Sequence, residues 1–488
     1  MLLTRRACLA AIGGVALGGC KITPLTRPSA ERPADPPAAK QPPPKDSMAR
    51  LQTFTPENFG AAGDGVTNDT AAFAQMTAAV IASGGGTVLL QKTTYIVGGH
   101  LAAPTPIFSF PPAPIMEFDG CTGPLIILGN GARLRCADGL RFGTFDPLTG
   151  AATHHAMPYT GTGELSSPYL AMITVQNCTG KVHIENLELD GNFMGLEIGG
   201  TYGDTGWQIP AYGLRLINNV AGETVVAVHT HHQPVDGVLI DAPATRNGAT
   251  ALDGIVSEYN VRQGCSVIGG SNFSFSNCQF NHTGKAGMVS SPGAGFDIEA
   301  ETNPIRNLSF SNCEFSNNTG TGMGADSGDS EGASFSNCRF IGTTNWAAWP
   351  RKPNFRFDSC AFVGSICNTY GDPDPTRAAQ FTNCEFYDDP ALSPTNEVYN
   401  ATFPIADLSD FANVLFDGCT FKLTGALVLP WTINVIYRDN VMSQLATKQA
   451  YPRGTFIGTN RIDGNVDLSG SHVLGDLTVN GQLVARTG

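Results

Sequence analysis

Phe275-Ser-Asn-Cys-Gln-Phe280 is the stretch that decides the fold, because its pattern Phe-x-x-Cys-x-Phe returns five more times along the chain. The intervals between successive Cys residues are 35, 25, 22, 24 and 35 residues. About 22 to 25 residues make one coil of a right-handed parallel β-helix, and a longer interval is a coil with an inserted loop. The sequence therefore predicts an all-β fold, a right-handed parallel β-helix built from one chain. The further copies are Phe310–Phe315, Phe335–Phe340, Phe357–Phe362, Phe381–Phe386 and Phe416–Phe421.

The side chains of this repeat divide between the interior and a bend. Alternation along the strands places both Phe and Cys inside the coil. Asn277 and its copies Asn312, Asn337 and Asn383 stand at the bend, where Asn tolerates a turn backbone and can hydrogen-bond its copies in neighbouring coils. The Cys residues are therefore expected to be stacked free thiols that act as small hydrophobes, not disulfides. Metal binding by Cys is not expected, because the sequence has no C-x-x-C motif and no Cys/His cluster.

The composition fits this fold class and limits the partners. With 57 Gly and only 15% charged residues, the chain suits a β-protein with many tight turns. Its formal net charge is −13. Residues 1–50 carry eight Lys or Arg and three Asp or Glu, so the part from Leu51 onward stands at −18. This acidic body argues against nucleic acid as a partner and mildly against a strongly anionic substrate.

Residues 1–20 have the pattern of an export signal. Arg5 and Arg6 precede an apolar run to Leu17, which is too short for a stable membrane span. Leu17-Gly-Gly-Cys20 resembles the bacterial lipobox, which implies a lipid on Cys20, and the Arg pair resembles a twin-arginine signal. A plain secretory signal with an incidental Cys is the alternative. We expect a protein of the bacterial cell envelope, an outer-membrane lipoprotein or a periplasmic or extracellular protein, that meets the membrane only through this N-terminal lipid.

Residues 58–70 open the body with Asn-Phe-Gly-Ala-Ala-Gly-Asp-Gly-Val-Thr-Asn-Asp-Thr. A helix is expected from Ala71 to about Ile81, capped by Asp69 or Thr70, and a strand from Thr87. This stretch resembles the start of the pectate-lyase-like β-helix superfamily, which implies a β-helix with an N-terminal capping helix. The resemblance leaves the chemistry open, because hydrolases, lyases, epimerases and phage tailspikes share the fold.

Four segments follow from these patterns. Residues 1–20 are the signal, and residues 21–50 form a Pro-rich linker. Residues 51–425 form the β-helix, with the irregular, Pro-rich residues 101–170 as loops inserted into the first coils. Residues 426–488 are the last coils or a C-terminal cap that covers the open end of the solenoid.

Aligning the strand after each repeat locates a candidate acidic site. Residues 295–299 match residues 322–326, and residues 264–268 precede both. In this register the outward-facing side chains are Arg262, Ser266, Asp297, Glu299 and Asp326. Asp297 and Glu299 are expected about 6.5–7 Å apart on one strand, and Glu299 and Asp326 about 4.8 Å apart in neighbouring coils.

Such close carboxyl groups suit general acid–base chemistry. One of them is expected to have a raised pKa and to serve as an acid, and separations of about 5 to 9.5 Å are those of glycoside hydrolases. The alternative is a Ca²⁺ site at Asp297, Glu299 and Glu301 of a polysaccharide lyase, with Arg262 or Lys285 as the base. A solvated acidic stripe without chemistry is the third interpretation.

A second resemblance covers residues 235–301. Arg262-Gln-Gly264 and the later Ala294-Gly-Phe-Asp-Ile-Glu299 resemble motifs of a group of bacterial β-helix proteins that are generally taken to act on carbohydrate. The group's upstream strand matches Asp236–Ile240. The resemblance does not fix the reaction. This chain has Ala300 where the group has Pro, and the familiar polygalacturonase signatures are absent, which puts pectin hydrolysis in doubt.

His229, His231 and His232 precede Asp236. His229 and His231 share one strand face and could bind sugar hydroxyls or move a proton. No carboxylate stands three or four residues from His229 or His231, so the spacing gives little support for a metal site.

The sequence thus predicts an enzyme that degrades a polysaccharide or oligosaccharide by glycoside hydrolysis and needs no cofactor. The predicted catalytic residues are Asp297, Glu299 and Asp326. The predicted sugar-binding residues are Arg262, Asp236, Gln263 and His231. A Ca²⁺-assisted lyase and a non-catalytic glycan-binding or adhesion solenoid are the alternatives.

Overall fold

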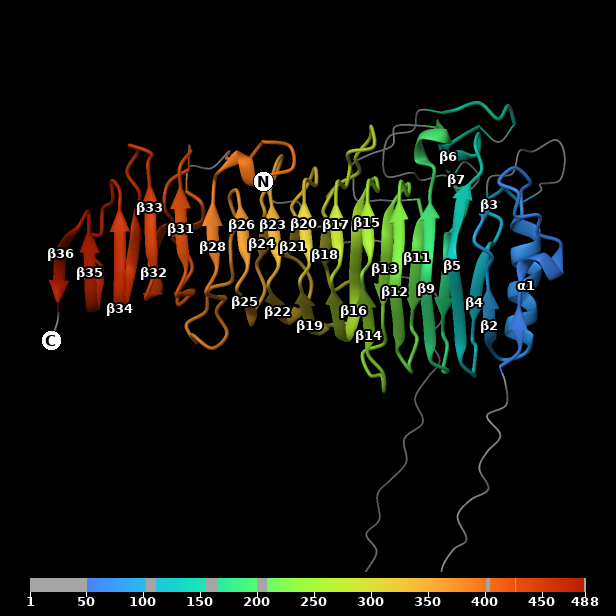
Figure 1. Cartoon of the computed structure of the whole chain (residues 1–488), viewed down its shortest axis with the longest axis horizontal. Helices are drawn as coiled ribbons and strands as arrows, with labels where there is room; N and C mark the ends of the chain where they lie inside the picture. The colour runs from blue at the N-terminus through green and yellow to red at the C-terminus, as the bar shows by residue number, and fades with distance from the viewer. Residues whose placement is uncertain are drawn as a thin grey trace, which may run out of the picture. The chain divides into compact units, whose positions relative to one another are not determined.

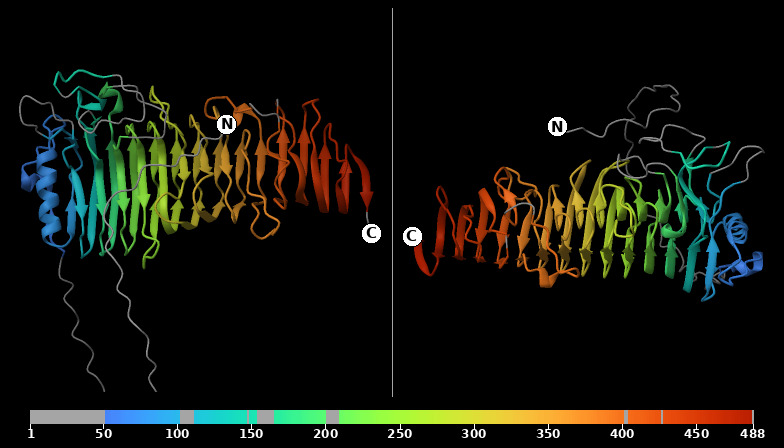
Figure 2. Two further views of the ribbon diagram at one scale, coloured as in Figure 1. Left: turned by 180° about the vertical axis from the view of Figure 1, so that it is seen from behind. Right: turned by 90° about the horizontal axis from the view of Figure 1, so that it is seen from above.

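Short parallel strands stack coil upon coil in the computed structural model, which forms the predicted right-handed parallel β-helix (Figure 1). The structure describes residues 51–101, 111–146, 148–153, 165–199, 209–400, 404–425 and 427–486. The predicted signal, linker and lipidated Cys20 lie outside these residues. One sheet of 33 strands runs through the stack, and its pairings are parallel except for the last, β35 with β36. Figure 2 shows the same coils from behind and from above. The all-β prediction is confirmed.

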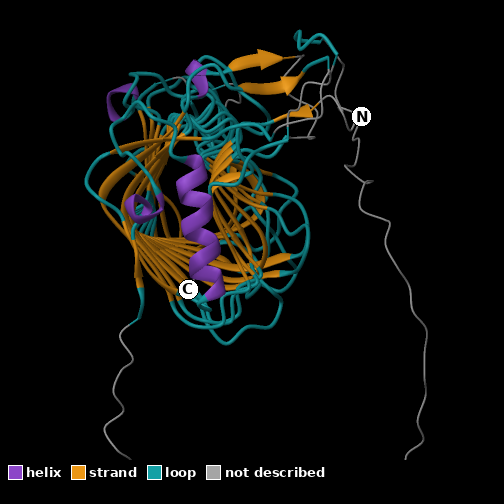
Figure 3. Ribbon diagram, turned by 90° about the vertical axis from the view of Figure 1, so that its right-hand side faces the viewer, coloured by secondary structure: helices purple, strands orange, loops and turns teal. Residues whose placement is uncertain are grey.

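The N-terminal helix α1 (Thr70–Ala82) follows the short 3-10 helix η1 (Pro56–Phe59) and lies across the end of the strand stack (Figure 3). Phe73, Met76 and Val80 of α1 are completely buried, so the helix covers the hydrophobic interior that the first coil would otherwise expose. Asp69 precedes the helix, but its carboxylate accepts hydrogen bonds from the Ala62 and Gly63 amides and makes no cap bond. The capping helix is confirmed, whereas the side-chain cap is not formed.

Two columns of strands carry the Phe and Cys repeat. Phe275, Phe310, Phe335 and Phe357 pair directly from coil to coil, and their rings stack with centroids 4.5–4.8 Å apart. The first column comprises β14 (Thr250–Asp253), β16 (Gln263–Ser276), β19 (Ile305–Ser311), β22 (Ser330–Ser336), β25 (Phe355–Asp358), β27 (Gln380–Thr382) and β30 (Leu415–Asp417). The second comprises β15 (Val256–Glu258), β17 (Gln279–Asn281), β20 (Glu314–Ser316), β23 (Arg339–Ile341), β26 (Ala361–Val363), β28 (Glu385–Tyr387) and β31 (Thr420–Leu423).

The bend between these columns is as predicted. Asn277, Asn312, Asn337 and Asn383 all adopt the left-handed conformation, with φ of 53–54°, which Asn tolerates better than most residues. The Asn312 amide donates a hydrogen bond to Asn277 Oδ1 at 3.3 Å. The eleven Cys residues of the described part are all free, and all but Cys367 are buried. The prediction of stacked thiols is confirmed.

Native thiol reactivity tests this arrangement. Because burial raises the pKa of thiols such as Cys384 and excludes reagent, we expect the ten buried Cys residues to resist a disulfide-exchange reagent until the protein unfolds. Reaction in denaturant without reductant then yields a full thiol count, whereas disulfides would lower it. The control is the Cys367→Ser variant, tested in its folded state. This variant lacks the half-buried Cys367 thiol, which is expected to react first among the described thiols.

A third column of parallel strands belongs to the same sheet: β4 (Met116–Asp119), β8 (Ala171–Gln176), β11 (Tyr212–Ile217), β13 (Asp236–Asp241), the first part of β16, β18 (Phe296–Ile298), β21 (Met323–Ala325) and β24 (Ala348–Pro350). A glycine recurs near the start of five of these strands. A Cβ on Gly237 would lie 2.1 Å from Ser257 Oγ, and one on Gly264 would lie 2.4 Å from Gly295 O. The glycines of the Asp-Gly, Gln-Gly and Ala-Gly motifs are therefore required by coil packing.

The residues around 101–170 depart from the predicted loops. They contain β4 and β5 (Leu125–Cys136), which complete a coil between β2 (Gly86–Leu89), β3 (Thr94–Val97) and β9 (Val182–Asp190). A small separate sheet is formed by β6 (Arg141–Thr144), β7 (Leu165–Ser166) and β10 (Glu197–Gly199). The loop prediction was wrong for residues 116–119 and 125–136, where alternating buried side chains form a regular coil.

Parallel strands continue to the C-terminal end of the described chain. They are β29 (Asp407–Leu408), β32 (Trp431–Arg438), β33 (Val441–Gln444), β34 (Pro452–Asp463) and β35 (His472–Val479), and β36 (Gln482–Arg486) returns antiparallel to β35. The antiparallel pair ends the coil-to-coil pairing. Within the residues described, no helix combines the length and the apolar character that crossing a membrane requires.

Candidate functional site

The predicted acidic site lies on the outer side of the third column, where five polar side chains form one network. Gln263 Nε2 donates to Asp297 Oδ2 at 2.5 Å. Ser266 Oγ donates to Asp236 Oδ2 at 2.9 Å and also contacts Gln263 Oε1. Arg262 Nη1 pairs with the same Asp236 oxygen at 3.4 Å. Three adjacent coils thus contribute to a single chain of contacts.

The register of the strands agrees with the alignment made from the sequence. Ser266 pairs with Asp297, and Asp297 pairs with Gly324. The Glu299 amide donates to Val267 O at 3.1 Å, so the pairing with the preceding coil continues beyond β18. Two residues after the pair of Asp297 with Gly324, the same register brings Glu299 next to Asp326. The predicted stacking of these carboxylates is therefore consistent with the pairing that the structure shows.

The residues expected to face outward differ in their exposure to solvent. Asp326 lies at the surface, whereas Asp297 is only 8% exposed and Ser266 is buried, so the expectation was wrong for these two. Asp236 and Gln263 are buried as well. The reason is that coils stack about 4.8 Å apart, so the side chains of one coil cover those of the next. Glu299 is half-buried, and Asp326 and Glu301 lie at the surface. The network is therefore a group of buried polar side chains, and the acidic side chains of Glu299, Asp326 and Glu301 lie at its solvent-facing edge.

Burial is the main cause of the raised pKa of Asp297. Desolvation, the negative charges of Glu299 and Asp326, and the opposing effect of Arg262 together raise the pKa of Asp297 to about 8. Burial also raises the pKa of Asp236, with Arg262 acting in the opposite direction. Partial desolvation and the charge of Glu299 raise the pKa of Asp326. The site therefore holds a carboxylic acid that stays protonated at neutral pH.

The neighbour of Asp297 in the next coil is Gly324, which has no side chain to cover the carboxyl group. A Cβ built on Gly324 would lie 3.4 Å from Asp297 Oδ1 and 3.3 Å from Thr321 Cγ2. Trp349 pairs with Gly324 on the far side and is half-buried. Ser327, which follows β21, donates from its Oγ to Glu299 Oε1 at 2.6 Å and holds this carboxylate in place.

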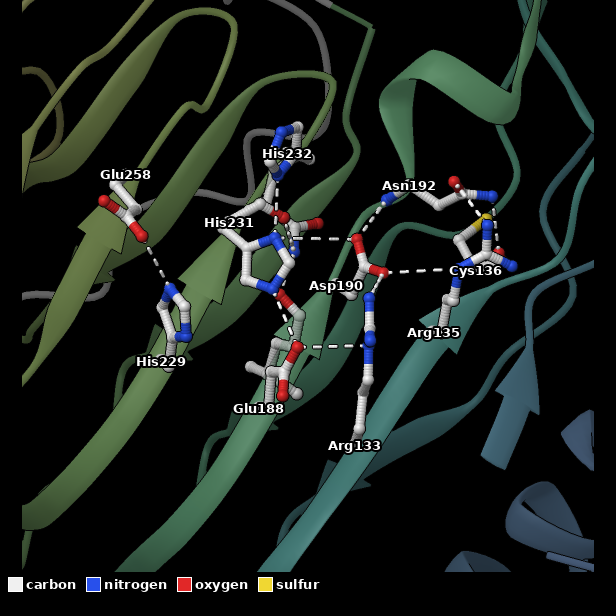
Figure 4. A network of polar contacts seen from close by, with 12 residues as sticks. Arg133, Arg135, Cys136, Glu188, Asp190, Asn192, His229, His231, His232 and Glu258 are labelled. Carbon is white, nitrogen blue, oxygen red and sulfur yellow. Dashed lines mark hydrogen bonds and ion pairs between the residues drawn. The ribbon is translucent and has the colours of Figure 1, made fainter. Parts of the chain in front are cut away.

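A second polar cluster lies where β9 and β12 (Glu223–His231) run side by side (Figure 4). His231 Nε2 lies 3.0 Å from Glu188 Oε1, and its Nδ1 lies 3.6 Å from Asp190 Oδ1. His229 Nε2 lies 3.1 Å from Glu258 Oε1. Arg133 Nη2 pairs with Asp190 at 2.5 Å. His231 is thus buried in an ion-pair network.

The carboxylates of this cluster were missed by the sequence argument. That argument searched for acids three or four residues from His229 and His231, a spacing that applies to helices. On stacked coils the partners come from the strands above and below, and Glu188 stands 43 residues before His231. Two groups of three have ligand atoms within 4.8 Å of one another: Glu188, His229 and His231, and Asp190, His231 and His232.

Two clefts lie elsewhere on the described surface. One of about 340 Å³ is lined by Arg339, Glu385, Tyr387, Asp389 and Lys422, among others. The other, of about 430 Å³, is lined by Asp388, Asn396 and Glu397, among others. Neither includes the predicted catalytic residues, which lie on the outer side of the third column.

No family model matches the chain. A segment of 129 residues is 33% identical to the KN3-capsule-specific Depolymerase 1 of Klebsiella phage KN3-1, and this match covers 25% of the chain and 14% of the relative.

Among solved structures, the A-module of the Azotobacter vinelandii mannuronan C-5 epimerase AlgE4 has a TM-score of 0.42 and 15% identity, and the match covers 87% of this chain and 97% of the module. The tailspike protein gp49 of the Acinetobacter baumannii bacteriophage Fri1, a capsular polysaccharide depolymerase, has a TM-score of 0.42 and 12% identity, over 85% and 63%.

Proposed function

We propose that this protein is an enzyme that degrades a polysaccharide by glycoside hydrolysis. The observation that carries the proposal is the buried Asp297 carboxyl group, whose pKa of about 8 keeps it protonated beside the acidic residues Glu299 and Asp326. The 33% identical segment of a capsule depolymerase supports a polysaccharide substrate. We also propose that the enzyme works at the cell envelope, attached through the lipid predicted at Cys20.

Each residue has a defined role in this mechanism. Asp297 donates its proton to the glycosidic oxygen as the bond to the sugar breaks. Glu299, two residues along the strand and about 6.5–7 Å away, activates a water molecule on the opposite face of the sugar, and this separation suits inversion. Asp326 adds negative charge that helps to keep the proton on Asp297. His231, predicted to bind sugar, is held in the second cluster instead.

The fully buried Asp236 is a positioning residue in this proposal. Its carboxylate holds Arg262 and Ser266, and Gln263 in turn holds Asp297. Arg262 and Gln263 therefore affect the reaction mainly by holding the Asp297 carboxyl group in position.

The lyase alternative fits the geometry less well. A protonated Asp297 is a poor Ca²⁺ ligand, because hard cations take ionised carboxylates. Arg262, the proposed base, is buried against Asp236, and Lys285 hydrogen-bonds Thr344 through its Nζ. These contacts favour hydrolysis over proton abstraction by either residue.

A degradation screen with bacterial capsular and exopolysaccharides tests the proposal. We expect new reducing ends without the ultraviolet absorption of an unsaturated product, and activity that survives a chelator of Ca²⁺. Unsaturated products would instead establish the lyase. Tight glycan binding without any cleavage would establish the non-catalytic solenoid.

The pH dependence follows from the same carboxyl group. A general acid acts only while protonated, so kcat/KM is expected to fall as the pH rises above about 8, the pKa of Asp297. The expected slope is a tenfold loss for each pH unit beyond that point. Measuring kcat/KM from about pH 6 to about pH 10 checks this. A rate that rises through this range would contradict an acid of raised pKa.

A further inference from the structure

The histidine cluster is arranged as a binding site that the hydrolysis at Asp297 does not use. Glu188 on β9 and His229 and His231 on β12 come from adjacent strands, with Glu188 paired directly with His229. Their ligand atoms lie within 4.8 Å of one another. We propose that Glu188, His229 and His231 bind a divalent transition-metal ion such as Zn²⁺. This inference does not depend on the proposed hydrolase activity.

His229 is oriented for metal binding by a carboxylate on its far side. Its Nε2 faces Glu258 Oε1 at 3.1 Å. The Nε2 proton can be donated to this carboxylate, which leaves the Nδ1 lone pair for a ligand. Figure 4 shows the second ring nitrogen of His229 on the side of Glu188 and His231. Metal-binding histidines almost always donate their other N–H in this way.

His231 has the complementary arrangement. Its Nε2 points to Glu188 Oε1 at 3.0 Å, and its Nδ1 lies 2.7 Å from His232 Nδ1. At this distance His232 Nδ1 can accept the Nδ1 proton of His231. An ion would then replace the proton between His231 Nε2 and Glu188.

Arg133 pairs with both acids of this cluster: its Nη2 lies 2.5 Å from Asp190 Oδ2, and its Nε lies 3.0 Å from Glu188 Oε1. A carboxylate has about four lone-pair sites on its two oxygens, so Glu188 can bind an ion through Oε2 while it keeps this ion pair. The nearby charges of Glu188, Asp190, Glu258, Arg133 and Arg135 sum to −1, which a divalent cation balances in part.

The chemistry of the ligands selects the class of metal. Two imidazoles and one carboxylate suit Zn²⁺ and related ions, whereas Ca²⁺ takes six to eight oxygens. The side chains of His229 and Glu188 are 40% and 34% exposed, so an ion there has access to solvent. With three protein ligands, at least one coordination position stays open to water or to a sugar hydroxyl.

Calorimetric titration of the full-length, chelator-treated protein with Zn²⁺ tests the site. We expect one equivalent to bind, and we expect His229→Ala or His231→Ala to weaken binding by more than about 100-fold. Glu258→Gln, which changes no ligand, is expected to weaken binding about 10- to 100-fold. His183→Ala is the matched control, because His183 also pairs with a carboxylate, Glu185, at 2.7 Å but lies outside the cluster. Its affinity is expected to equal that of the wild type.

Two further measurements distinguish metal binding at this site from metal binding elsewhere on the protein. Co²⁺ in place of Zn²⁺ is expected to give a spectrum without thiolate charge transfer, which excludes the Cys residues as ligands. Thermal melting establishes that each variant is folded. The proposal is overturned if no equivalent binds, if the His229→Ala, His231→Ala double variant binds as well as the wild type, or if Ca²⁺ displaces Zn²⁺ at equal concentration.

Discussion

Asp297→Asn is expected to lower kcat by about 10²- to 10⁴-fold, the usual contribution of a general acid or base. The amide keeps the shape of the side chain and can still accept the hydrogen bond from Gln263, but it cannot transfer a proton to a leaving oxygen. Substrate binding should be nearly unchanged, because the proton matters for bond cleavage and not for the fit of the sugar. The comparison of kcat with KM in the Asn variant measures this difference.

The same substitution is expected to stabilise the fold at high pH. The pKa of Asp297 is about 8 in the folded protein and about 3.9 in an unfolded chain. Between these values the folded state binds the extra proton, so stability falls as the pH rises from about 4 to about 8. Asn does not titrate and removes this loss, so the melting temperature of the variant should exceed that of the wild type above about pH 8.

Asp358→Asn is the matched control, because Asp358 is exposed on the bend of β25, away from the site. It is expected to change neither kcat nor the pH dependence of melting. An active Asp297→Asn variant would remove Asp297 from the mechanism. An inactive variant whose melting temperature keeps the wild-type pH dependence would show that the carboxyl group is not protonated in the folded state.

The repeat could be predicted because it is local. Phe275, Cys278 and Phe280 lie within one strand–bend–strand unit, and alternation fixes which side chains point inward. The pairing of Asp297 with Gly324 follows once the coils are aligned, since each coil repeats the same geometry. The coil at β5 was missed because Gly129-Asn-Gly131 interrupts its apolar pattern and suggests a loop. In the structure Asn130 is a bend residue, with φ of 53°.

The burial of the site and the histidine cluster could not be predicted in this way. Both depend on side chains that meet across coils: Ser266 reaches Asp236 from 30 residues away, and His229 reaches Glu258 from 29. Inserted loops change these separations from coil to coil, so no fixed spacing in the sequence reveals them. A search for acids in the strand before and the strand after each His, in the aligned register, would have found Glu188 and Glu258.

Arg262→Met is expected to destabilise the protein by about 3–5 kcal/mol, because it leaves the Asp236 carboxylate buried without its cation. Asp236 is fully buried, and its Oδ1 already has no hydrogen-bond partner among the described residues. Burial raises the pKa of Asp236, and Arg262 opposes this effect. Without Arg262 the carboxyl group should take up a proton, so the destabilisation should be smaller at low pH. Thermal melting at several pH values measures both effects.

A second substitution separates the buried charge from the loss of packing. In the Arg262→Met, Asp236→Asn double variant no charge is left unpaired, and the amide oxygen can still accept the Ser266 hydroxyl, so most of the lost stability should return. Arg438→Met is the matched control: Arg438 pairs with Asp417 at 3.0 Å at a partly exposed site, where such pairs contribute at most about 1 kcal/mol. If the double variant folds stably but remains far less active than the wild type, Arg262 and Asp236 serve to position Asp297. Recovery of stability and activity together would instead make the pair purely structural.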